Sequence, residues 1–322
     1  MFTSYVRLRR TQSSVSLRLT APFKRSLAAC GRDEERRGNA MIQPANYQRR
    51  GYLHEDFRLF HLRDMGVEEM EYHYHEFDKI VIFLSGRASY IIEGRSYFLE
   101  PWDVLLVSHH LIHKPVTDPE QPYERVVIYL NSGFLRSSGT RGEDLGLCFD
   151  LARERQFALM RPGGGEREGL ELLLESLERA LEDRGFGGDL LARTCFLQLL
   201  VRLNREMMRD RTHRDQSASQ YDPKIAQALS YINDHLGEEL TVDALARQVY
   251  TSKYHFMRRF KELTGCPVHQ YITQKRLLAA AGLLRAGVSA QEACGQCGFQ
   301  DYSAFHRAFR RQFGATPREF MP

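Results

Sequence analysis

The last third of the chain contains the same short pattern twice: a helix, a tight turn, a second helix and a glycine. In the copy over residues 288–317, Ser289 is placed to cap a first helix, and Gly298 is the residue type that accepts the left-handed turn at a helix end. A second helix is predicted from about Asp301 to Phe313. Two copies in register are much harder to obtain by chance than one, so this repeat constrains the fold more than any other feature.

The second helix of this copy divides into an apolar and a basic face. Phe305, Phe309 and Phe313 recur every four residues and therefore share one face. The opposite face carries Ser303, His306, Arg307, Arg310 and Arg311. An apolar face that packs the helix down, with a basic face pointing outward, is what a recognition helix in a DNA major groove requires.

The earlier copy, over residues 240–265, follows the same order. Thr241 is placed to cap its first helix, and its second helix is predicted from Ser252 to Gly265, with Phe256, Phe260 and Leu263 on the buried stripe. The exposed side is predicted to carry Lys253, Tyr254, Met257, Arg258 and Lys261. We call residues 240–265 the first reader and residues 288–317 the second reader.

A strongly helix-forming segment, Val268–Arg285, separates the two readers. As one helix it would be roughly 27 Å long at 1.5 Å per residue. Successive major-groove faces on one side of B-DNA lie ~34 Å apart, so one rigid helix could hold both readers on adjacent turns of a duplex. This geometry predicts an asymmetric binding element for one chain.

These residues strongly resemble the DNA-binding domain of the AraC/XylS family of bacterial transcription regulators, from about Pro223 to Phe320. The resemblance rests on Ala246, Tyr250–Ser252, Phe256, Arg259-Phe260, Gly265, Tyr271-Ile272, Arg276-Leu277, Ala280, Leu284, Cys297-Gly298-Phe299, Phe305, Arg307, Phe309, Gly314 and Thr316-Pro317. The sequence departs from the family pattern where Ala293-Cys294 replaces the usual Ile-Ala, and where Met321 stands in place of a common Arg.

The resemblance implies which side chains reach base edges. They are Tyr254, Met257 and Arg258 in the first reader and Tyr302, Ser303, His306 and Arg307 in the second. Because Met257 cannot donate a hydrogen bond, we expect the first reader to use apolar contact with a thymine methyl. With the flanking basic residues, the predicted DNA-binding set is Lys253, Tyr254, Met257, Arg258, Lys261, Tyr302, Ser303, His306, Arg307 and Arg310.

The charge is distributed unevenly along the chain, although its net value is only +4. Residues 220–322 hold 13 Lys and Arg against 9 Asp and Glu, a net charge of +4. Residues 41–219 hold 23 against 29, a net charge of −6. A basic module joined to an acidic one suits a part that touches phosphate and a sensor that must not.

Six cysteines are scattered through the chain, which indicates reduced thiols in a cytoplasmic protein. Cys294 and Cys297 form a lone Cys-x-x-Cys that could sense redox state or hold a metal. No second cysteine pair accompanies it in the sequence, so we favour the interpretation that Cys297 fills a core position and Cys294 replaces a small alanine.

Residues 1–40 are basic, with 9 Lys and Arg against 3 Asp and Glu, and show no consistent period. They loosely imitate a transit peptide, or could form a basic arm that touches DNA. We expect a disordered tail instead, with Met41 as a plausible true start.

From about Asp56 to Asn131 the pattern changes to short β-branched and aromatic runs separated by Gly86, Gly94 and Pro101, which predicts a small antiparallel barrel or sandwich. The order His73-x-His75, Gly86, Gly94, Pro101-Trp-Asp103 and His113 resembles a cupin barrel, as in the sensor half of many AraC-type regulators.

The histidines of this region allow two interpretations. His73 and His75 are two residues apart, so on a strand they share a face, and with His113 they could bind a divalent metal. A metal cupin usually supplies a Glu shortly afterwards, and Lys79 stands in that place, so we predict no metal and no cofactor. The barrel is expected instead to hold a small polar effector through His73, His75, Tyr90, Trp102 and His113, although each could equally be a core residue.

Two amphipathic stretches between Leu170 and Arg209 predict a helical pair that packs on the barrel and builds a dimer interface, or merely covers the barrel. A flexible joint is expected at Gly163–Gly165, and a polar interdomain linker from Arg209 to Tyr221.

The fold class is therefore predicted as α+β: a cupin-like antiparallel β-barrel, a helical linker and dimerisation pair, and an all-α tandem helix-turn-helix domain. The predicted boundaries are 1–40 for the tail, 41–135 for the barrel, 136–220 for the helical region and 221–322 for the DNA-binding domain.

The function predicted from this organisation is a cytoplasmic, effector-controlled transcription regulator without enzyme activity. Its expected partners are double-stranded DNA, a sugar or other small polar metabolite and a second copy of the chain, and RNA polymerase is a further candidate. The sequence contains no run of 18 uncharged apolar residues, so it predicts no membrane span. The alternatives are a metal-dependent cupin enzyme with a DNA-binding appendage and a DNA-binding protein whose barrel takes no ligand.

Overall fold

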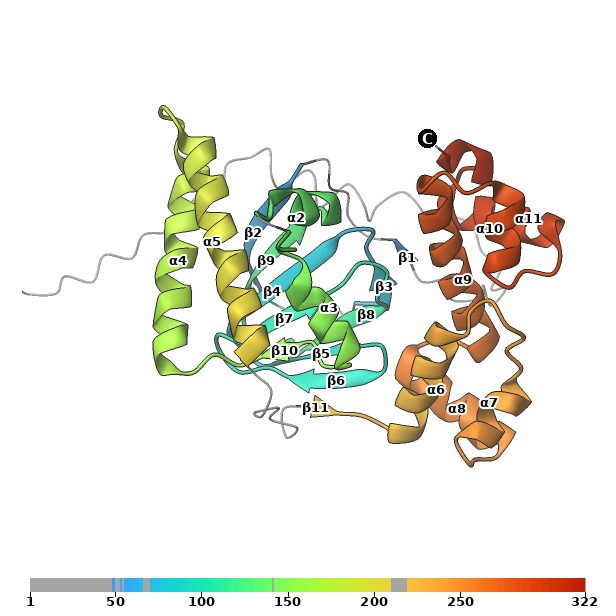
Figure 1. The fold of residues 1–322 in the computed structure, drawn as a ribbon. Coiled ribbons are helices and arrows are strands. Elements are labelled where there is room, and N and C mark those ends of the chain that lie inside the picture. Colours follow the sequence, from blue (N-terminus) through green and yellow to red (C-terminus); the bar gives the residue numbers. More distant parts are fainter. Residues whose placement is uncertain are drawn as a thin grey trace, which may run out of the picture. The chain divides into compact units, whose positions relative to one another are not determined.

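The computed structural model describes residues 48–49, 53, 55–65, 70–140, 142–209 and 219–321. Residues Ala45–Pro322 form one compact unit. The tail predicted over residues 1–40 lies outside the described residues. The part that is described has the predicted α+β class, with two β-sheets in its first half and helices in its second (Figure 1).

A five-stranded antiparallel sheet forms one layer of the barrel. Its strand order is β10 (Leu159–Met160), β7 (Val104–Val107), β4 (Asp78–Ser85), β9 (Tyr123–Leu130) and β2 (Phe57–Asp64). Along β4 the side chains alternate between two cores, because Ile80 and Ile82 pack with the helices while Val81 packs inside the barrel. This alternation explains why the strand is apolar on both faces.

A six-stranded sheet forms the other layer. Its order is β1 (Gln48–Arg49), β3 (His73–Tyr74), β8 (His113–Thr117), β5 (Ala88–Ile92), β6 (Arg95–Phe98) and β11 (Ser219–Gln220). The expected linker therefore ends in a short strand, with Ser219 paired to Tyr97. Apolar side chains from both sheets meet in one interior cluster, which includes Val81, Tyr97 and Val127.

Glu93 and Gly94 form the two-residue turn between β5 and β6. Their φ angles are +46° and +75°, so both lie in the left-handed region. A tight hairpin of this length needs positive φ at both positions, which is why Asn-Gly is its favoured sequence. A glutamate at the first position is therefore unusual, and its side chain bears on the site described below.

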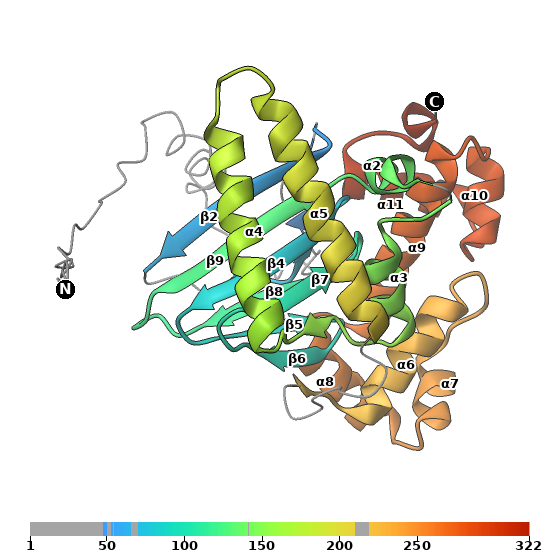
Figure 2. The same cartoon turned by 60° about the vertical axis from the view of Figure 1, so that its left-hand side comes forward.

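Four helices follow the barrel strands: α2 (Ser132–Ser138), α3 (Leu147–Glu154), α4 (Gly164–Glu182) and α5 (Gly188–Arg209). Figures 1 and 2 show α4 and α5 side by side across one face of the five-stranded sheet. Leu174 and Leu177 of α4 and Leu199 of α5 are buried in the core that they share with this sheet. The prediction of a flexible joint at Gly163–Gly165 was wrong, because Gly164 begins α4.

The remaining helices are α6 (Pro223–Asp234), α7 (Val242–Gln248), α8 (Lys253–Thr264), α9 (Val268–Arg285), α10 (Ala290–Gln296), α11 (Tyr302–Phe313) and the 3₁₀ turn η2 (Pro317–Phe320). The predicted caps are formed: the Thr241 side chain accepts from the Ala244 amide, and the Ser289 side chain accepts from the Glu292 amide. Gly265 ends α8 with φ +80°. Of the helices in the described residues, none is sufficiently long and apolar to cross a membrane.

Candidate nucleic-acid interface and barrel ligand site

The first reader presents α8 with the predicted division of faces. Phe256 and Phe260 are fully buried, whereas Tyr254 is 78% exposed and Met257 is 44% exposed. Arg258 and Lys261 are exposed on the same helix. The free side of α8 therefore offers an aromatic ring, a thioether and two cations to a ligand of the size of a DNA groove.

Arg258 and a third cation at the start of α8, Lys253, have acidic neighbours. Lys253 Nζ lies 2.7 Å from a carboxylate oxygen of Asp243, and Arg258 Nε lies 3.8 Å from one of Glu262. The side chains of Lys253, Asp243 and Arg258 are more than half exposed to solvent, and that of Glu262 is half exposed. Exposed ion pairs contribute little and are screened by salt, so both cations can exchange these partners for phosphate at small cost.

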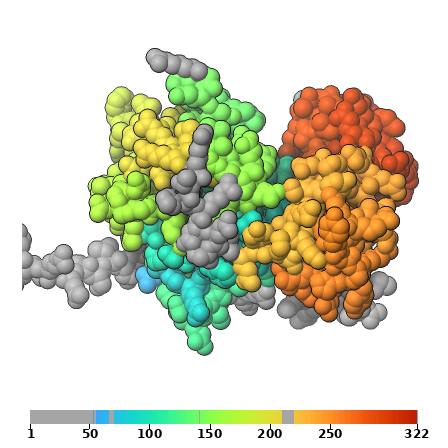
Figure 3. Space-filling view, turned by 60° about the horizontal axis from the view of Figure 1, so that its bottom comes forward, coloured from blue at the N-terminus to red at the C-terminus, as the bar shows by residue number. Residues whose placement is uncertain are grey.

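The second reader presents α11 in the same way. Phe305 and Phe309 are fully buried, and Phe313 packs partly buried against Phe309 with ring centroids 4.5 Å apart. Ser303, Arg307 and Arg310 are exposed, Tyr302 is 36% exposed, and His306 is half-buried. Figure 3 shows part of this helical surface, with the first reader in orange and the second in red.

Helix α9 holds the two readers together. Tyr271 and Leu278 belong to the core of the first reader, while Ala281 and Leu284 belong to the core of the second. One helix buried in both cores keeps the two exposed faces at a fixed separation, as the sequence predicted for Val268–Arg285.

Cys294 and Cys297 are both buried in the core of the second reader as free thiols. Burial raises the pKa of both thiols, that of Cys297 to about 11. A thiol that stays protonated at neutral pH is a poor metal ligand and a slow nucleophile. The pair therefore fits the packing interpretation of the sequence.

In the barrel, three of the predicted effector residues form one buried cluster. His73 is paired with His113 across β3 and β8, and His75 follows β3 directly. The ring centroids are 4.5 Å apart for His73 and His113, 5.1 Å for His73 and His75, and 5.0 Å for His75 and His113. Burial, together with the charge of Lys79, holds the pKa of His113 well below its usual value, so this ring is neutral.

Tyr90 joins this cluster and brings a cation that the sequence analysis had not assigned to the site. The Tyr90 ring stacks on His113 with centroids 5.8 Å apart, and its hydroxyl accepts a hydrogen bond of 2.8 Å from Lys79 Nζ. Lys79 is only 7% exposed. The sequence showed Lys79 as the substitute for a metal-binding acid, but its place at the start of β4 did not reveal which side chain it would meet.

Trp102 lies elsewhere. It packs against the core between the five-stranded sheet and the helices, with the Arg167 guanidinium 5.7 Å from its ring centroid. The structure therefore brings together His73, His75, Tyr90 and His113, and does not bring Trp102 to them. Proximity in sequence to Pro101 and Asp103 gave no information about which side of the sheet this ring would occupy.

A set of contacts between the barrel and the helical domain was not predicted. Glu93 accepts hydrogen bonds from the Tyr271 hydroxyl and, at 3.1 Å, from Lys275 Nζ, both on α9. The Glu93 and Lys275 side chains are only 15% and 10% exposed. Arg285, at the end of α9, lies 3.1 Å from a carboxylate oxygen of Glu76.

The segment around β3 also contacts the helical domain. The Tyr72 hydroxyl donates to the Leu263 carbonyl at 3.0 Å, and Gln312 Nε2 of α11 donates to the Tyr74 hydroxyl at 2.8 Å. Because side chains alternate along an extended chain, Tyr72 and Tyr74 face the helices while His73 and His75 face the cluster. A single short segment thus touches both the buried histidines and the DNA-binding half.

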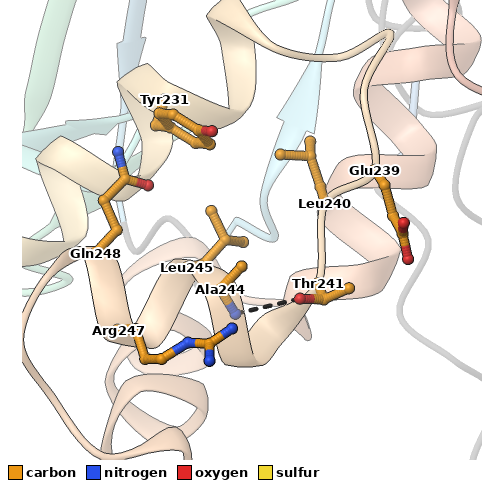
Figure 4. Close-up of a pocket in the computed structure, with 8 residues that line it drawn as sticks. All are labelled: Tyr231, Glu239, Leu240, Thr241, Ala244, Leu245, Arg247 and Gln248. Atoms are coloured by element: carbon orange, nitrogen blue, oxygen red, sulfur yellow. Dashed lines mark hydrogen bonds between the residues drawn. The ribbon is translucent and has the colours of Figure 1, made fainter.

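A surface pocket lies in the first reader unit, on the side of α6 and α7 (Figure 4). It is lined by Tyr231, Glu239, Leu240, Thr241, Ala244, Leu245, Arg247 and Gln248. Its lining shares no residue with the predicted DNA-binding set or with the histidine cluster. The Thr241 hydroxyl at its edge is engaged in capping α7.

A β-barrel joined to two exposed basic helices that share one connecting helix is the architecture of a DNA-binding protein with a second, sensor-like domain. Comparison with known families supports this class on both halves. Residues 56–200 match the family model described as an AraC-like ligand binding domain, and residues 245–321 match a helix-turn-helix domain. The chain belongs to the AraC family of DNA-binding transcription regulators, with an N-terminal ligand-binding domain.

The chain is also similar to individual known proteins. The transcriptional activator RhaS of Salmonella paratyphi A is 27% identical over 252 residues, which cover 77% of this chain and 86% of RhaS. Among solved structures, the DNA-binding domain of AdpA in complex with a target DNA is 37% identical and matches 31% of this chain and 89% of its own, with a TM-score of 0.30. The structure of ToxT from Vibrio cholerae is 15% identical and matches 83% of this chain and 98% of its own, with a TM-score of 0.31.

Proposed function

We propose that this regulator reads DNA with the exposed faces of α8 and α11, and that a small polar effector in the barrel controls its occupancy of DNA. The observation that carries the proposal is α9, which is buried in the cores of both readers and is bound by the barrel through Glu93. A change in the barrel therefore bears directly on the element that sets the spacing of the readers.

The roles of the reader side chains follow from their chemistry. Arg307 can donate two parallel hydrogen bonds to a guanine, and Arg258 can do the same in the first reader. Lys253, Lys261 and Arg310 supply phosphate contacts, which fix the register but carry no sequence information. Tyr254, Met257, Tyr302, Ser303 and His306 complete the faces that meet the bases.

The effector site is assigned to His73, His75, Tyr90 and His113, with Lys79 added. Imidazole and phenol groups exchange hydrogen bonds with hydroxyls, and a buried ammonium group favours a carboxylate or another electron-rich oxygen. A sugar acid or another small hydroxylated anion fits this chemistry. A ligand that binds only the native barrel must raise its melting temperature.

The coupling between the two halves is a population shift. An effector that moves the segment Tyr72–His75 changes the contacts that Tyr72 and Tyr74 make with the helical domain. Such a ligand shifts the equilibrium between reader arrangements by its difference in affinity for the two states.

The protein is proposed to act as a homodimer through α4 and α5. These helices and the turn between them expose Leu172, Phe186, Leu190 and Leu191, with exposed fractions of 64%, 109%, 67% and 52%. Several large apolar side chains exposed together on one helical pair mark an interaction surface, and a second copy of the same surface is a self-complementary partner. We place the dimer in the cytoplasm, where both promoter DNA and RNA polymerase are available to it.

The test is a footprint of the full-length protein on the promoter regions beside its own gene, at low and moderate salt. The expected result is two protected patches one helical turn apart for each protomer, with affinity that falls as salt rises. Replacement of Arg258 by Ala should remove selectivity in one patch and Arg307→Ala in the other. A footprint that neither substitution alters would reject the assignment of the readers.

A further inference from the structure

We propose that His73, His75 and His113 form a binding site for one divalent transition-metal ion, of the kind that imidazole favours, such as Zn²⁺, Co²⁺ or Ni²⁺. One ring nitrogen of each residue lies within 4.8 Å of the others. The three side chains are 3%, 3% and 0% exposed, so the cluster is closed to bulk water. Three imidazoles, two from the paired strands β3 and β8 and one from the residue after β3, are a ligand set that proteins use for such ions.

The hydrogen bonds of two rings orient them for this role. His73 Nδ1 lies 2.9 Å from the Glu71 carbonyl oxygen, and His113 Nδ1 lies 2.8 Å from the Leu111 carbonyl oxygen. A carbonyl only accepts, so each Nδ1 carries the proton and donates it, which leaves Nε2 with a lone pair in the neutral ring. A backbone carbonyl that fixes the tautomer in this way is the usual outer partner of a metal-binding histidine.

His113 Nε2 supplies an independent reason for a ligand. It is buried and has no hydrogen-bond partner among the residues that the structure describes. A buried acceptor that is left unsatisfied costs about 1–3 kcal/mol. A metal ion bound to this atom would satisfy it.

The spacing requires only a small closure of the cluster. Nitrogen ligands about 2.0–2.1 Å from a tetrahedral ion lie roughly 3.4 Å from one another. Starting from separations within 4.8 Å, the rings reach this spacing by rotations that move each nitrogen by about an ångström or less.

Charge decides what completes the coordination. Three neutral imidazoles leave the ion with its full double charge, and the Lys79 ammonium is hydrogen-bonded to Tyr90, whose ring stacks on His113. Two cations this close in a buried site repel each other strongly. The fourth position of the ion is therefore assigned to an anion, either hydroxide or the carboxylate of a small molecule, which offsets the charge of both. Lys79 thus becomes a residue that makes metal binding depend on an anion.

The experiment uses tag-free, full-length protein that is stripped with a chelator, passed through a desalting column and titrated with Co²⁺ or Zn²⁺. Metal content is measured by elemental analysis, and the visible spectrum of bound Co²⁺ reports its coordination. We expect one equivalent per chain with nitrogen ligands. His75→Gln and His113→Gln should each lower the affinity by about 100-fold or more, since changes even in outer partners cost about 10- to 100-fold.

The matched control is His269→Gln, since His269 is exposed on α9 and distant in sequence from the cluster. It should bind as the unmodified protein does. Lys79→Gln should tighten binding of the metal alone and weaken its dependence on added acetate or another carboxylate. Thermal melting of each variant without metal separates loss of a ligand from loss of the fold.

Three results would overturn the proposal: no stoichiometric binding, binding that His75→Gln and His113→Gln leave intact, or a Co²⁺ spectrum with thiolate bands. The last result is informative even where a histidine variant does not fold, because it needs only the unmodified protein. Metal content is measured without DNA, so this outcome is independent of whether the readers act as proposed.

Discussion

The ion pair between Glu93 and Lys275 provides a sharp prediction about how the barrel holds α9. At a separation of 3.1 Å the Coulomb attraction is about 5 kcal/mol for an effective dielectric constant of 20. Both side chains are largely buried, so desolvation offsets much of this attraction. With the hydrogen bond from Tyr271 included, we expect a net contribution of about 1–3 kcal/mol, as for hydrogen bonds to charged groups.

The substitution Glu93→Asn removes this contribution, and a second substitution at Lys275 separates the ion pair from the other roles of Glu93. Glu93 has a φ of +46° ahead of Gly94 at +75°, and Asn-Gly is the favoured pair for such a turn. The shorter asparagine suits the turn, but it removes the carboxylate that accepts from Lys275, from Tyr271 and, within the barrel, from the Ile112 backbone amide. The barrel should therefore lose one hydrogen bond, partly offset by the better turn, and α9 should lose protection.

The assay is a double-mutant cycle of Glu93→Asn and Lys275→Met, read by hydrogen exchange of the α9 amides in the full-length protein. We expect a coupling free energy of about 1–3 kcal/mol between the two sites. A coupling below about 0.5 kcal/mol, which is within the usual additivity of independent sites, would show that this ion pair does not hold α9 to the barrel.

The remaining predictions concern the readers and the helical pair. Arg307→Ala should weaken specific binding by about 1–3 kcal/mol and relax preference at one base pair, whereas the neighbouring Arg311→Ala should weaken binding to all sequences alike; equal behaviour in a panel of mutated sites would contradict the distinction. Phe309→Ala should destabilise the second reader by about 3–5 kcal/mol in denaturant unfolding, because the ring is fully buried against Phe305, Phe313 and Phe320. A variant as stable as the original protein would show that Phe309 does not stabilise this core. Replacing Leu190 and Leu191 with Ser should shift the protein from dimer to monomer in analytical ultracentrifugation without a large loss of barrel stability, and an unchanged sedimentation coefficient would place the dimer interface elsewhere.

The helical half could be predicted from the sequence because its signals are local. Caps at Thr241 and Ser289, the left-handed ends at Gly265 and Gly298, and phenylalanines at helical spacing each depend on residues within a turn or two. The connecting helix has the bounds that composition indicated, Val268–Arg285. The side chains predicted to face outward on α8 and α11 are exposed, apart from the half-buried His306.

The barrel site could be predicted only in part. Alternation along a strand placed His73 and His75 on one face, and the resemblance to a cupin barrel indicated that His113 could join them. Neither feature shows which strands pair. The proximity of Lys79 to Tyr90 and the position of Trp102 in the other core therefore could not be predicted, because both depend on long-range contacts. The Glu93 network joins residues about 180 positions apart, as the Glu93–Lys275 hydrogen bond shows, and no local signal encodes it.

The central claim is that α8 and α11 read two consecutive major grooves of one duplex. The most direct measurement is a hydroxyl-radical footprint of the full-length protein on its highest-affinity genomic site, compared with the footprints of Arg258→Ala and Arg307→Ala. The account predicts two protected segments about 10 base pairs apart for each protomer. Arg258→Ala should remove the preference for particular bases in one segment only, and Arg307→Ala in the other segment only. A single protected segment, or loss of both segments together in either well-folded variant, would contradict it.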